Sequence, residues 1–196
     1  MRIDYFYSHI SPWTFLGHQR FLDIAKKYHS TIDFVPLTLA KVFSVSGGLP
    51  LAKRPPQRQA YRMWELKRWP SVLGIKINIE PKHFPVNDGP SAKIALLVQR
   101  NGGNISKLSL AFMRAVWQEE RNISDRDTLI GITNDYGFDG NALYNESLSE
   151  PANKLLEASC TRANETEVFG APTYVVDGEP FWGQDRLDLL ERALIV

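Results

Sequence analysis

The hydrophobic and polar positions at the start of the chain follow a strand, helix, strand order. Residues 1–8 form a β-prone apolar run, and apolar positions then recur at helical spacing to about Tyr28. Ser11-Pro12 opens the helical pattern, because Ser can cap a helix and Pro fits its first position. A second strand is expected from Thr31 to about Leu39. The pattern therefore predicts one βαβ unit.

The middle of the chain reads as a series of helices after a stretch punctuated by Gly and Pro. We expect these helices at about residues 57–73, 91–101, 105–121, 124–135 and 151–166. Pro70 lies inside the first of them and is expected to kink or end it, since proline lacks the backbone donor. Ser124, with Asp127 three residues later, is expected to cap the fourth.

Strand character returns near the end of the chain. Thr173 to Val176 and Glu179 to Trp182 flank Asp177-Gly178, a dipeptide that favours a tight hairpin turn. A final helix is expected from about Asp185 to Leu194. The order predicts an α/β, thioredoxin-like fold interrupted by helices. Its expected parts are a discontinuous thioredoxin-like domain of residues 1–41 and 167–196, and a helical insertion of residues 42–166.

Composition and charge limit the kinds of partner that we expect this protein to bind. The 196 residues are 43% hydrophobic, which suits a folded soluble protein. The 23 Lys and Arg against 22 Asp and Glu leave no broad basic field, so nucleic acid is not an expected partner. The longest apolar run, Ile94 to Val98, is far shorter than the roughly 20 residues that a membrane span needs. No secretory signal pattern opens the sequence, so we expect a cytoplasmic protein.

Cysteine and histidine exclude two kinds of chemistry. The single Cys160 cannot form an internal disulfide, a dithiol pair or a thiolate cluster for a metal. His18, His29 and His83 show no ligand spacing with one another, so no metal is expected. His9 stands two residues from Ser11, and its ordinary pKa near 6.5 would suit a proton carrier.

Four stretches resemble one known family. They are Ser11-Pro12-Trp13-Thr14-Phe15-Leu16-Gly17; Ala60-Tyr61 with Glu65-Leu66-Lys67-Arg68-Trp69; Phe84-Pro85-Val86-Asn87; and Val168-Phe169-Gly170-Ala171-Pro172-Thr173 leading to Phe181-Trp182-Gly183-Gln184-Asp185-Arg186-Leu187. With these motifs the chain resembles the 2-hydroxychromene-2-carboxylate isomerases, relatives of the kappa-class glutathione transferases within the DsbA-like thioredoxin branch. The resemblance covers nearly the whole chain.

The resemblance implies glutathione as cofactor and Ser11 as the catalytic residue. Ser11 and Thr14 occupy the ends of the window where thioredoxin-like oxidoreductases carry two cysteines, so disulfide exchange through a thiolate pair is excluded. A helix N-terminus favours a negative charge, and the Ser11 hydroxyl would donate to the glutathione thiolate. The alternative is that Ser11 only caps the helix.

Pro172 matches the position where thioredoxin-like folds hold a cis proline, and the resemblance implies a cis bond here. Ala171 would then pair through its backbone with glutathione; an ordinary Pro before a strand is the alternative. The resemblance also places Asp185 at the ammonium of the γ-glutamyl group, unless it only caps the last helix. The expected glutathione-binding set is Ser11, Val168, Ala171, Pro172, Trp182, Gly183, Gln184 and Asp185.

A basic stretch from residue 53 to 68 carries six Lys and Arg against the single acid Glu65. Arg can hold a carboxylate through two hydrogen bonds, and glutathione and a keto-acid substrate both carry carboxylates. The alternative is a solvated helix face. Asn87 is a further pocket candidate, although its neighbours Asp88-Gly89-Pro90 also suit a plain turn. The expected substrate-binding set is Lys41, Lys53, Arg54, Arg58 and Asn87.

The resemblance implies a glutathione-dependent isomerase that interconverts 2-hydroxychromene-2-carboxylate and trans-o-hydroxybenzylidenepyruvate, in aromatic-compound catabolism. Its partners would be glutathione and a small aromatic keto acid, and the chain would form a homodimer. A kappa-class-like glutathione transferase or peroxidase is one alternative. A non-catalytic thioredoxin-like binding module is the other, and it predicts no affinity for glutathione.

Overall fold

The computed structural model describes residues 1–195 and begins with the expected βαβ unit. Strand β1 (Arg2–Tyr7) is followed by helix α1 (Pro12–Lys27) and by strand β2 (Thr31–Pro36), which pairs with β1 in parallel. Ser11 caps α1 as expected, because its hydroxyl accepts a hydrogen bond from the Thr14 amide at 3.2 Å. Both strands and the helix are therefore confirmed.

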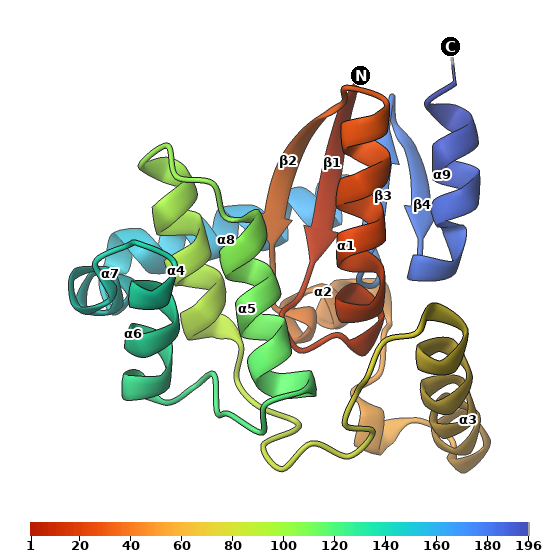
Figure 1. Ribbon diagram of the computed structural model, residues 1–196, viewed down its shortest axis with the longest axis horizontal. Coiled ribbons are helices and arrows are strands. Elements are labelled where there is room, and N and C mark those ends of the chain that lie inside the picture. The colour runs from red at the N-terminus through yellow and green to blue at the C-terminus, as the bar shows by residue number, and fades with distance from the viewer. Residues whose placement is uncertain (196) are drawn as a thin grey trace.

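The sheet joins the two ends of the chain (Figure 1). Its four strands lie in the order β2-β1-β3-β4, where β3 (Thr173–Val176) pairs antiparallel with β1 and β4 (Glu179–Trp182) pairs antiparallel with β3. Asp177 and Gly178 both have positive φ, 49° and 86°, as the expected tight hairpin turn requires. The α/β, thioredoxin-like fold with inserted helices is confirmed.

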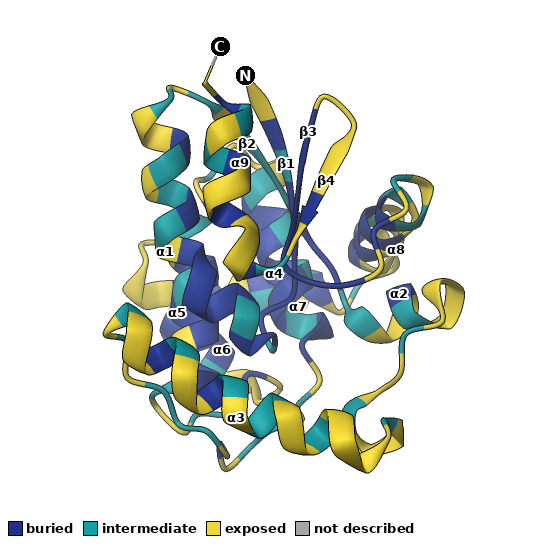
Figure 2. Cartoon of the chain, turned by 90° about the vertical axis from the view of Figure 1, so that its right-hand side faces the viewer, coloured by how far each residue is buried: buried dark blue, intermediate teal, exposed yellow. Residues whose placement is uncertain are grey.

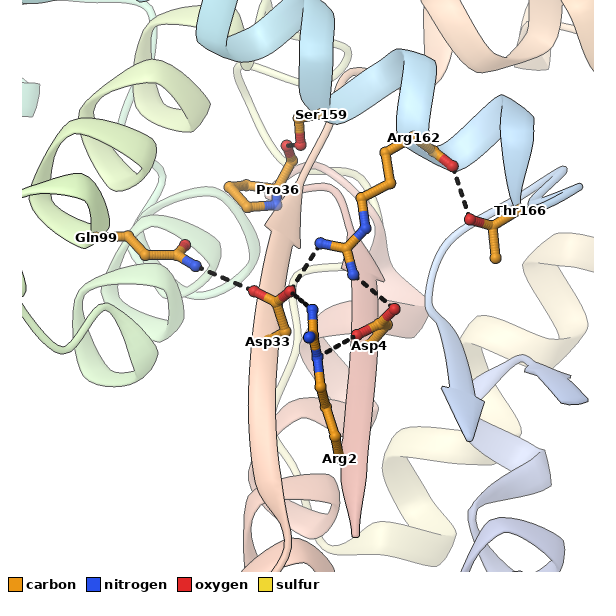
Figure 3. A network of polar contacts seen from close by, with 8 residues as sticks. All are labelled: Arg2, Asp4, Asp33, Pro36, Gln99, Ser159, Arg162 and Thr166. Atoms are coloured by element: carbon orange, nitrogen blue, oxygen red, sulfur yellow. Dashed lines mark hydrogen bonds and ion pairs between the residues drawn. The ribbon is translucent and has the colours of Figure 1, made fainter. Parts of the chain in front are cut away.

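Side chains of β1 alternate between two apolar layers. Tyr5 packs with α1 and with α9 (Leu187–Ala193) on one face of the sheet, whereas Phe6 packs on the other face with α8 (Glu150–Glu165) and α2 (Leu39–Ser46). On the α8 side, an ion-pair network joins the helix to both strands (Figure 3). Arg162 lies 2.5 Å from Asp4 and 2.7 Å from Asp33.

The remaining helices form a third apolar cluster beside the sheet. They are α4 (Gly89–Arg100), α5 (Ser106–Trp117), α6 (Arg126–Asp135) and α7 (Gly140–Ser147). Helix α3 (Pro56–Leu73) lies at the end of the sheet where β1 leads into α1, and most of its length is exposed (Figures 1 and 2). Short 3-10 turns, η1 (Leu51–Lys53) and η2 (Gln184–Arg186), precede α3 and α9.

Three details differ from the sequence-based expectation. Helices α2 and α7, eight residues each, were not predicted, since two turns give too few repeats for a helical period to stand out. The cap of α6 is Asp125 rather than Ser124, whose hydroxyl instead donates to Asn122. Helix α3 continues past Pro70 and ends at Leu73, where Gly74 adopts a φ of 66°. No helix within residues 1–195 is long and apolar enough to cross a membrane.

Candidate active site

The candidate site begins at the N-terminus of α1, next to the carboxyl end of β1. Ser11 is buried, and its hydroxyl accepts from the Thr14 amide while donating to the carbonyl oxygen of Ala171 at 3.1 Å. No acidic side chain lies in the first turn of α1, where the positive end of the helix dipole favours an anion. Ser11 therefore sits where a negative charge would be stabilised.

Ala171 reaches this helix from the far end of the sequence. The Ala171-Pro172 peptide bond is cis, as the resemblance implied, and Phe84-Pro85 is also cis. Ala171 is buried, and its carbonyl faces the Ser11 hydroxyl. The structure thus brings together the two outer motifs of the sequence.

The end of β4 forms a second wall. The Gly183 amide donates to the Pro172 carbonyl at 2.9 Å, and Gly183 has a φ of 104°, which favours glycine. Trp182 is half exposed and meets Phe169 edge to face, with the ring centroids 4.8 Å apart. Val168 lies behind them in the core. An exposed aromatic pair therefore flanks the backbone of Ala171 and Gly183.

Gln184 and Asp185 have different surroundings. Gln184 is buried against α1, and its side-chain oxygen accepts a hydrogen bond from Arg20 at 3.1 Å. Asp185 is exposed, and its carboxylate pairs with Arg186 at 2.8 Å. The exposed carboxylate of Asp185 can be reached by a ligand, as its expected role of binding an ammonium group requires. The side-chain amide of Gln184 already has a protein partner.

The basic residues expected to bind substrate are not all alike. Lys41, in α2, pairs with Glu157 of α8 at 3.2 Å. Lys53 and Arg58 are exposed. Arg54 is partly buried, donates to the Leu49 carbonyl at 2.9 Å and lies over the ring of Phe43. Lys41 thus has an acidic partner, whereas no ion pair forms at Arg54 or Arg58 within residues 1–195.

Arg62 is a further cation of this group that the sequence did not single out. Its guanidinium lies 5.4 Å from the ring centre of Phe84, and no carboxylate within the described part of the chain pairs with it. Burial, together with the positive charge of Arg54, lowers the pKa of Arg62 to about 10. Phe84 packs in the same apolar cluster as Ile10 and Trp13, the neighbours of Ser11. The spacing of four residues between Arg58 and Arg62 was the available signal.

Asn87 makes the plain turn contact, since its side-chain oxygen accepts from the Gly89 amide at 3.0 Å.

His9 is buried, and its Nδ1 lies 2.9 Å from the Ser91 hydroxyl. Burial lowers the pKa of His9 to about 3, so it is neutral at physiological pH and unsuited to carry a proton to solvent. Within residues 1–195 no cluster of His, Cys, Asp or Glu is arranged to hold a metal ion.

A family profile described as a DsbA-like thioredoxin domain matches residues 2–195. The chain belongs to the DsbA-like thioredoxin family. Within this family, the chain is 27% identical to a 2-hydroxychromene-2-carboxylate isomerase of Sphingobium xenophagum, over 98% of this chain and 97% of that protein. It is 23% identical to glutathione S-transferase kappa 1 of Rattus norvegicus, over 98% of this chain and 90% of the relative.

Solved structures of the DsbA-like family agree with this placement. The structure of a 2-hydroxychromene-2-carboxylate isomerase superposes with a TM-score of 0.79 and 25% identity, covering 99% of this chain and 94% of that one. The resemblance to the isomerases is therefore confirmed. The residue before α1 is Ser11 rather than a cysteine, so this site supplies no thiol of its own.

Proposed function

We propose that the chain is a glutathione-dependent isomerase of the 2-hydroxychromene-2-carboxylate type, acting on a small aromatic keto acid in the catabolism of aromatic compounds. The observation that carries the proposal is the Ser11 hydroxyl at the N-terminus of α1, whose first turn has no acidic side chain, 3.1 Å from the Ala171 carbonyl. The names of the isomerase and kappa-class relatives support it. Bound glutathione would supply a thiolate nucleophile: its addition to the conjugated double bond of the substrate would leave a single bond that can rotate, and its expulsion would restore the double bond as the other isomer.

The residues present fit such a cofactor. The first-turn amides of α1 and the Ser11 hydroxyl are donors for a thiolate, and the hydroxyl would turn from Ala171 toward the sulfur. The freed carbonyl and amide of Ala171 would pair with the cysteinyl backbone. Trp182 and Gly183 would border the γ-glutamyl group, and Asp185 would accept a hydrogen bond from its ammonium. Val168, Pro172 and Gln184 would shape this wall from behind.

The basic residues would hold carboxylates. Arg54 and Arg62 are partly buried cations that have no acidic partner within residues 1–195, and burying a charge without a partner is unfavourable. A ligand carboxylate between them would remove that penalty, and Lys53, Arg58 and Asn87 would line the same side. Lys41 would contribute only after leaving Glu157. The expected ligands are therefore anions.

The test combines binding and turnover. Titration calorimetry with glutathione at millimolar concentration should show binding, and the conversion of trans-o-hydroxybenzylidenepyruvate should require glutathione without consuming it. Consumption of glutathione would favour a kappa-class-like transferase, which the rat relative supports. The absence of any binding would instead favour a non-catalytic binding module. A cytoplasmic location and a homodimer belong to the same proposal, and the dimer is tested by light scattering.

A further inference from the structure

The loop that carries Ser11 is held by the start of α4. Ser8, at the end of β1, donates its hydroxyl proton to the Asp88 carboxylate at 2.6 Å, across 80 residues of sequence. Ser8 is 1% exposed and Asp88 is 4% exposed, so water does not compete for this hydrogen bond. A buried hydrogen bond to a charged group is among the stronger contacts in a protein.

A second bridge joins the same two segments. The Ser91 hydroxyl donates to the backbone carbonyl of Asp88 at 2.9 Å, and His9 Nδ1 lies 2.9 Å from the same hydroxyl oxygen. Because Ser91 uses its proton on Asp88, His9 donates from Nδ1 and remains neutral. Both residues are buried. The segment from Ser8 to Ile10 is thus fastened to α4 at two points.

The Asp88 carboxylate does not make the contact that its position favours. Asp88 is the N-cap of α4, where a carboxylate ordinarily accepts from an amide of its own helix, yet it makes no capping hydrogen bond. It accepts instead from the Ser8 hydroxyl. The carboxylate is turned from its own helix toward the loop.

Ser8 links Asp88 to Ser11 through a second hydrogen bond. The Ser11 amide donates to the Ser8 carbonyl at 3.1 Å, so the residue that Asp88 holds also fixes the backbone of Ser11. We infer that Asp88 is a positioning residue for Ser11, acting through Ser8 to keep the Ser11 hydroxyl at the mouth of the thiolate site. This inference rests on the proposed function for the role of the hydroxyl, but the link from Asp88 to Ser11 does not.

Burial disfavours the charged form of the Asp88 carboxylate, and the hydrogen bond from Ser8 favours it. Burial raises the pKa of Asp88 to about 6, and hydrogen bonding, above all from the Ser8 hydroxyl, opposes the rise. The titratable side chain on the same loop is His9, which stays neutral and whose Nδ1 contacts Ser91, and the next charge on α4 is Lys93, which binds Asn153 of α8. Above a pH of about 6 the carboxylate is charged and accepts from Ser8 at full strength.

Four variants distinguish a role of Asp88 in positioning Ser11 from a general contribution to protein stability. Ser8→Ala and Asp88→Ala break the contact, whereas Asp88→Asn keeps an acceptor but cannot ionise. Ser159→Ala is the matched control, because its hydroxyl also makes a buried 2.6 Å hydrogen bond, to the Pro36 carbonyl of β2. The readouts are the pH titration of the bound glutathione thiolate by its ultraviolet absorbance, and hydrogen exchange at the Ser11 amide.

Ser8→Ala and Asp88→Ala should lower the thiolate fraction at neutral pH about tenfold. Asp88→Asn, which offers a neutral acceptor at every pH, should lower it less, and Ser159→Ala should leave it at the wild-type value. The wild-type loss of thiolate stabilisation below a pH of about 6 should be absent in Asp88→Asn. Exchange at the Ser11 amide should accelerate in Ser8→Ala and Asp88→Ala but not in Ser159→Ala.

Unchanged exchange and an unchanged thiolate fraction in Ser8→Ala and Asp88→Ala would overturn the inference. If the wild-type protein binds no glutathione, the proposed function fails, and the exchange at Ser11 still decides whether Asp88 positions it.

Discussion

The Ser11 hydroxyl donates a hydrogen bond to the carbonyl oxygen of Ala171, a residue 160 positions later in the chain. The same oxygen of Ser11 accepts from the Thr14 amide, so one side chain both caps α1 and ties it to the segment that enters β3. The two interpretations of Ser11, cap and functional group, are therefore compatible in one geometry.

Ser11→Ala should raise the pKa of bound glutathione, because the variant loses the donor that would stabilise the thiolate. The expected loss is about 1.5–3 kcal/mol for a hydrogen bond to a charged group, whereas the free energy of unfolding should fall by about 0.5–2 kcal/mol for the lost cap. Absorbance titration and urea denaturation measure the two quantities. An unchanged thiol pKa would limit Ser11 to capping.

Arg62→Met should weaken the binding of an anionic ligand about 10- to 150-fold, the equivalent of one charge-assisted hydrogen bond. Arg54→Ala and Arg58→Ala test the residues expected from sequence in the same way. Lys67→Met and Arg68→Met are the controls, because Lys67 is exposed over Trp64 and Arg68 already pairs with Glu65 at 2.7 Å. Calorimetry with glutathione and with a keto acid compares them; equal, small losses in all five variants would indicate diffuse electrostatic attraction.

Gly17→Ala should destabilise the fold, because a methyl group at Gly17 would lie 2.7 Å from Cβ of Gln184 and 3.0 Å from the Tyr174 hydroxyl. We expect a loss of about 1–3 kcal/mol in the free energy of unfolding. Gly131→Ala is the matched control, since the nearest atom there is 3.7 Å away, in a flexible Arg121 side chain. The control should gain up to about 1 kcal/mol from helix propensity; a neutral Gly17→Ala would show that Gln184 can move.

Acid should destabilise the protein through two buried histidines. Burial lowers the pKa of His9 to about 3 and that of His18 to about 4, below the ordinary value near 6.5 in the unfolded chain. The unfolded state then binds protons that the folded state does not, so this stability is present above pH 6.5 and is lost as the pH falls toward 4. Asp88 acts in the opposite direction, because its folded pKa of about 6 exceeds the unfolded value.

Two histidines outweigh one carboxyl, and we expect a net loss of roughly 2–3 kcal/mol between pH 7 and pH 5. Urea denaturation at the two pH values measures it. Asp88→Asn should deepen the loss by removing the opposing contribution. A protein that gains stability on acidification would contradict the assignment of neutral, buried histidines.

Arg162→Met should remove the ion pairs between α8 and the two strands shown in Figure 3. Because the Arg162 side chain is 34% exposed, solvent screens these pairs, and the expected loss is about 1 kcal/mol. The loss should shrink in molar salt. Arg126→Met, which removes a wholly superficial pair with Asp127, should change the thermal midpoint little in either buffer.

Local sequence signals predicted most of the fold. The apolar periods of β1 and α1, the Ser11-Pro12 start and the Asp177-Gly178 turn each depend on neighbouring residues, and all are confirmed. The cap of α6 was assigned one residue too early, because Ser124 and Asp125 are both good caps and only the Asn122 contact decides between them.

The candidate site was harder to predict from the sequence than the fold. The motifs named Ser11 and Ala171, but only the folded chain shows that they meet. The sequence could not distinguish Arg62 from the other five cations of its stretch, because whether a cation forms an ion pair depends on the tertiary structure. Asp88 looked like a turn residue, since its partner Ser8 lies 80 positions away. The hydrogen bond from Arg20 to the side-chain oxygen of Gln184 also joins residues far apart in the sequence, so no local pattern could show it.

The placement of β1 in the middle of the sheet has a consequence for biosynthesis. Its second edge is completed by β3, which begins at Thr173, and the Ala171 carbonyl arrives in the same segment. At about 5–20 residues per second, the ribosome needs roughly ten to thirty seconds to make the intervening chain. During that interval β1 has an open edge, which is prone to wrong pairing. A nascent chain that stalls within the helical segment should therefore require a chaperone until the segment that completes this edge has been made.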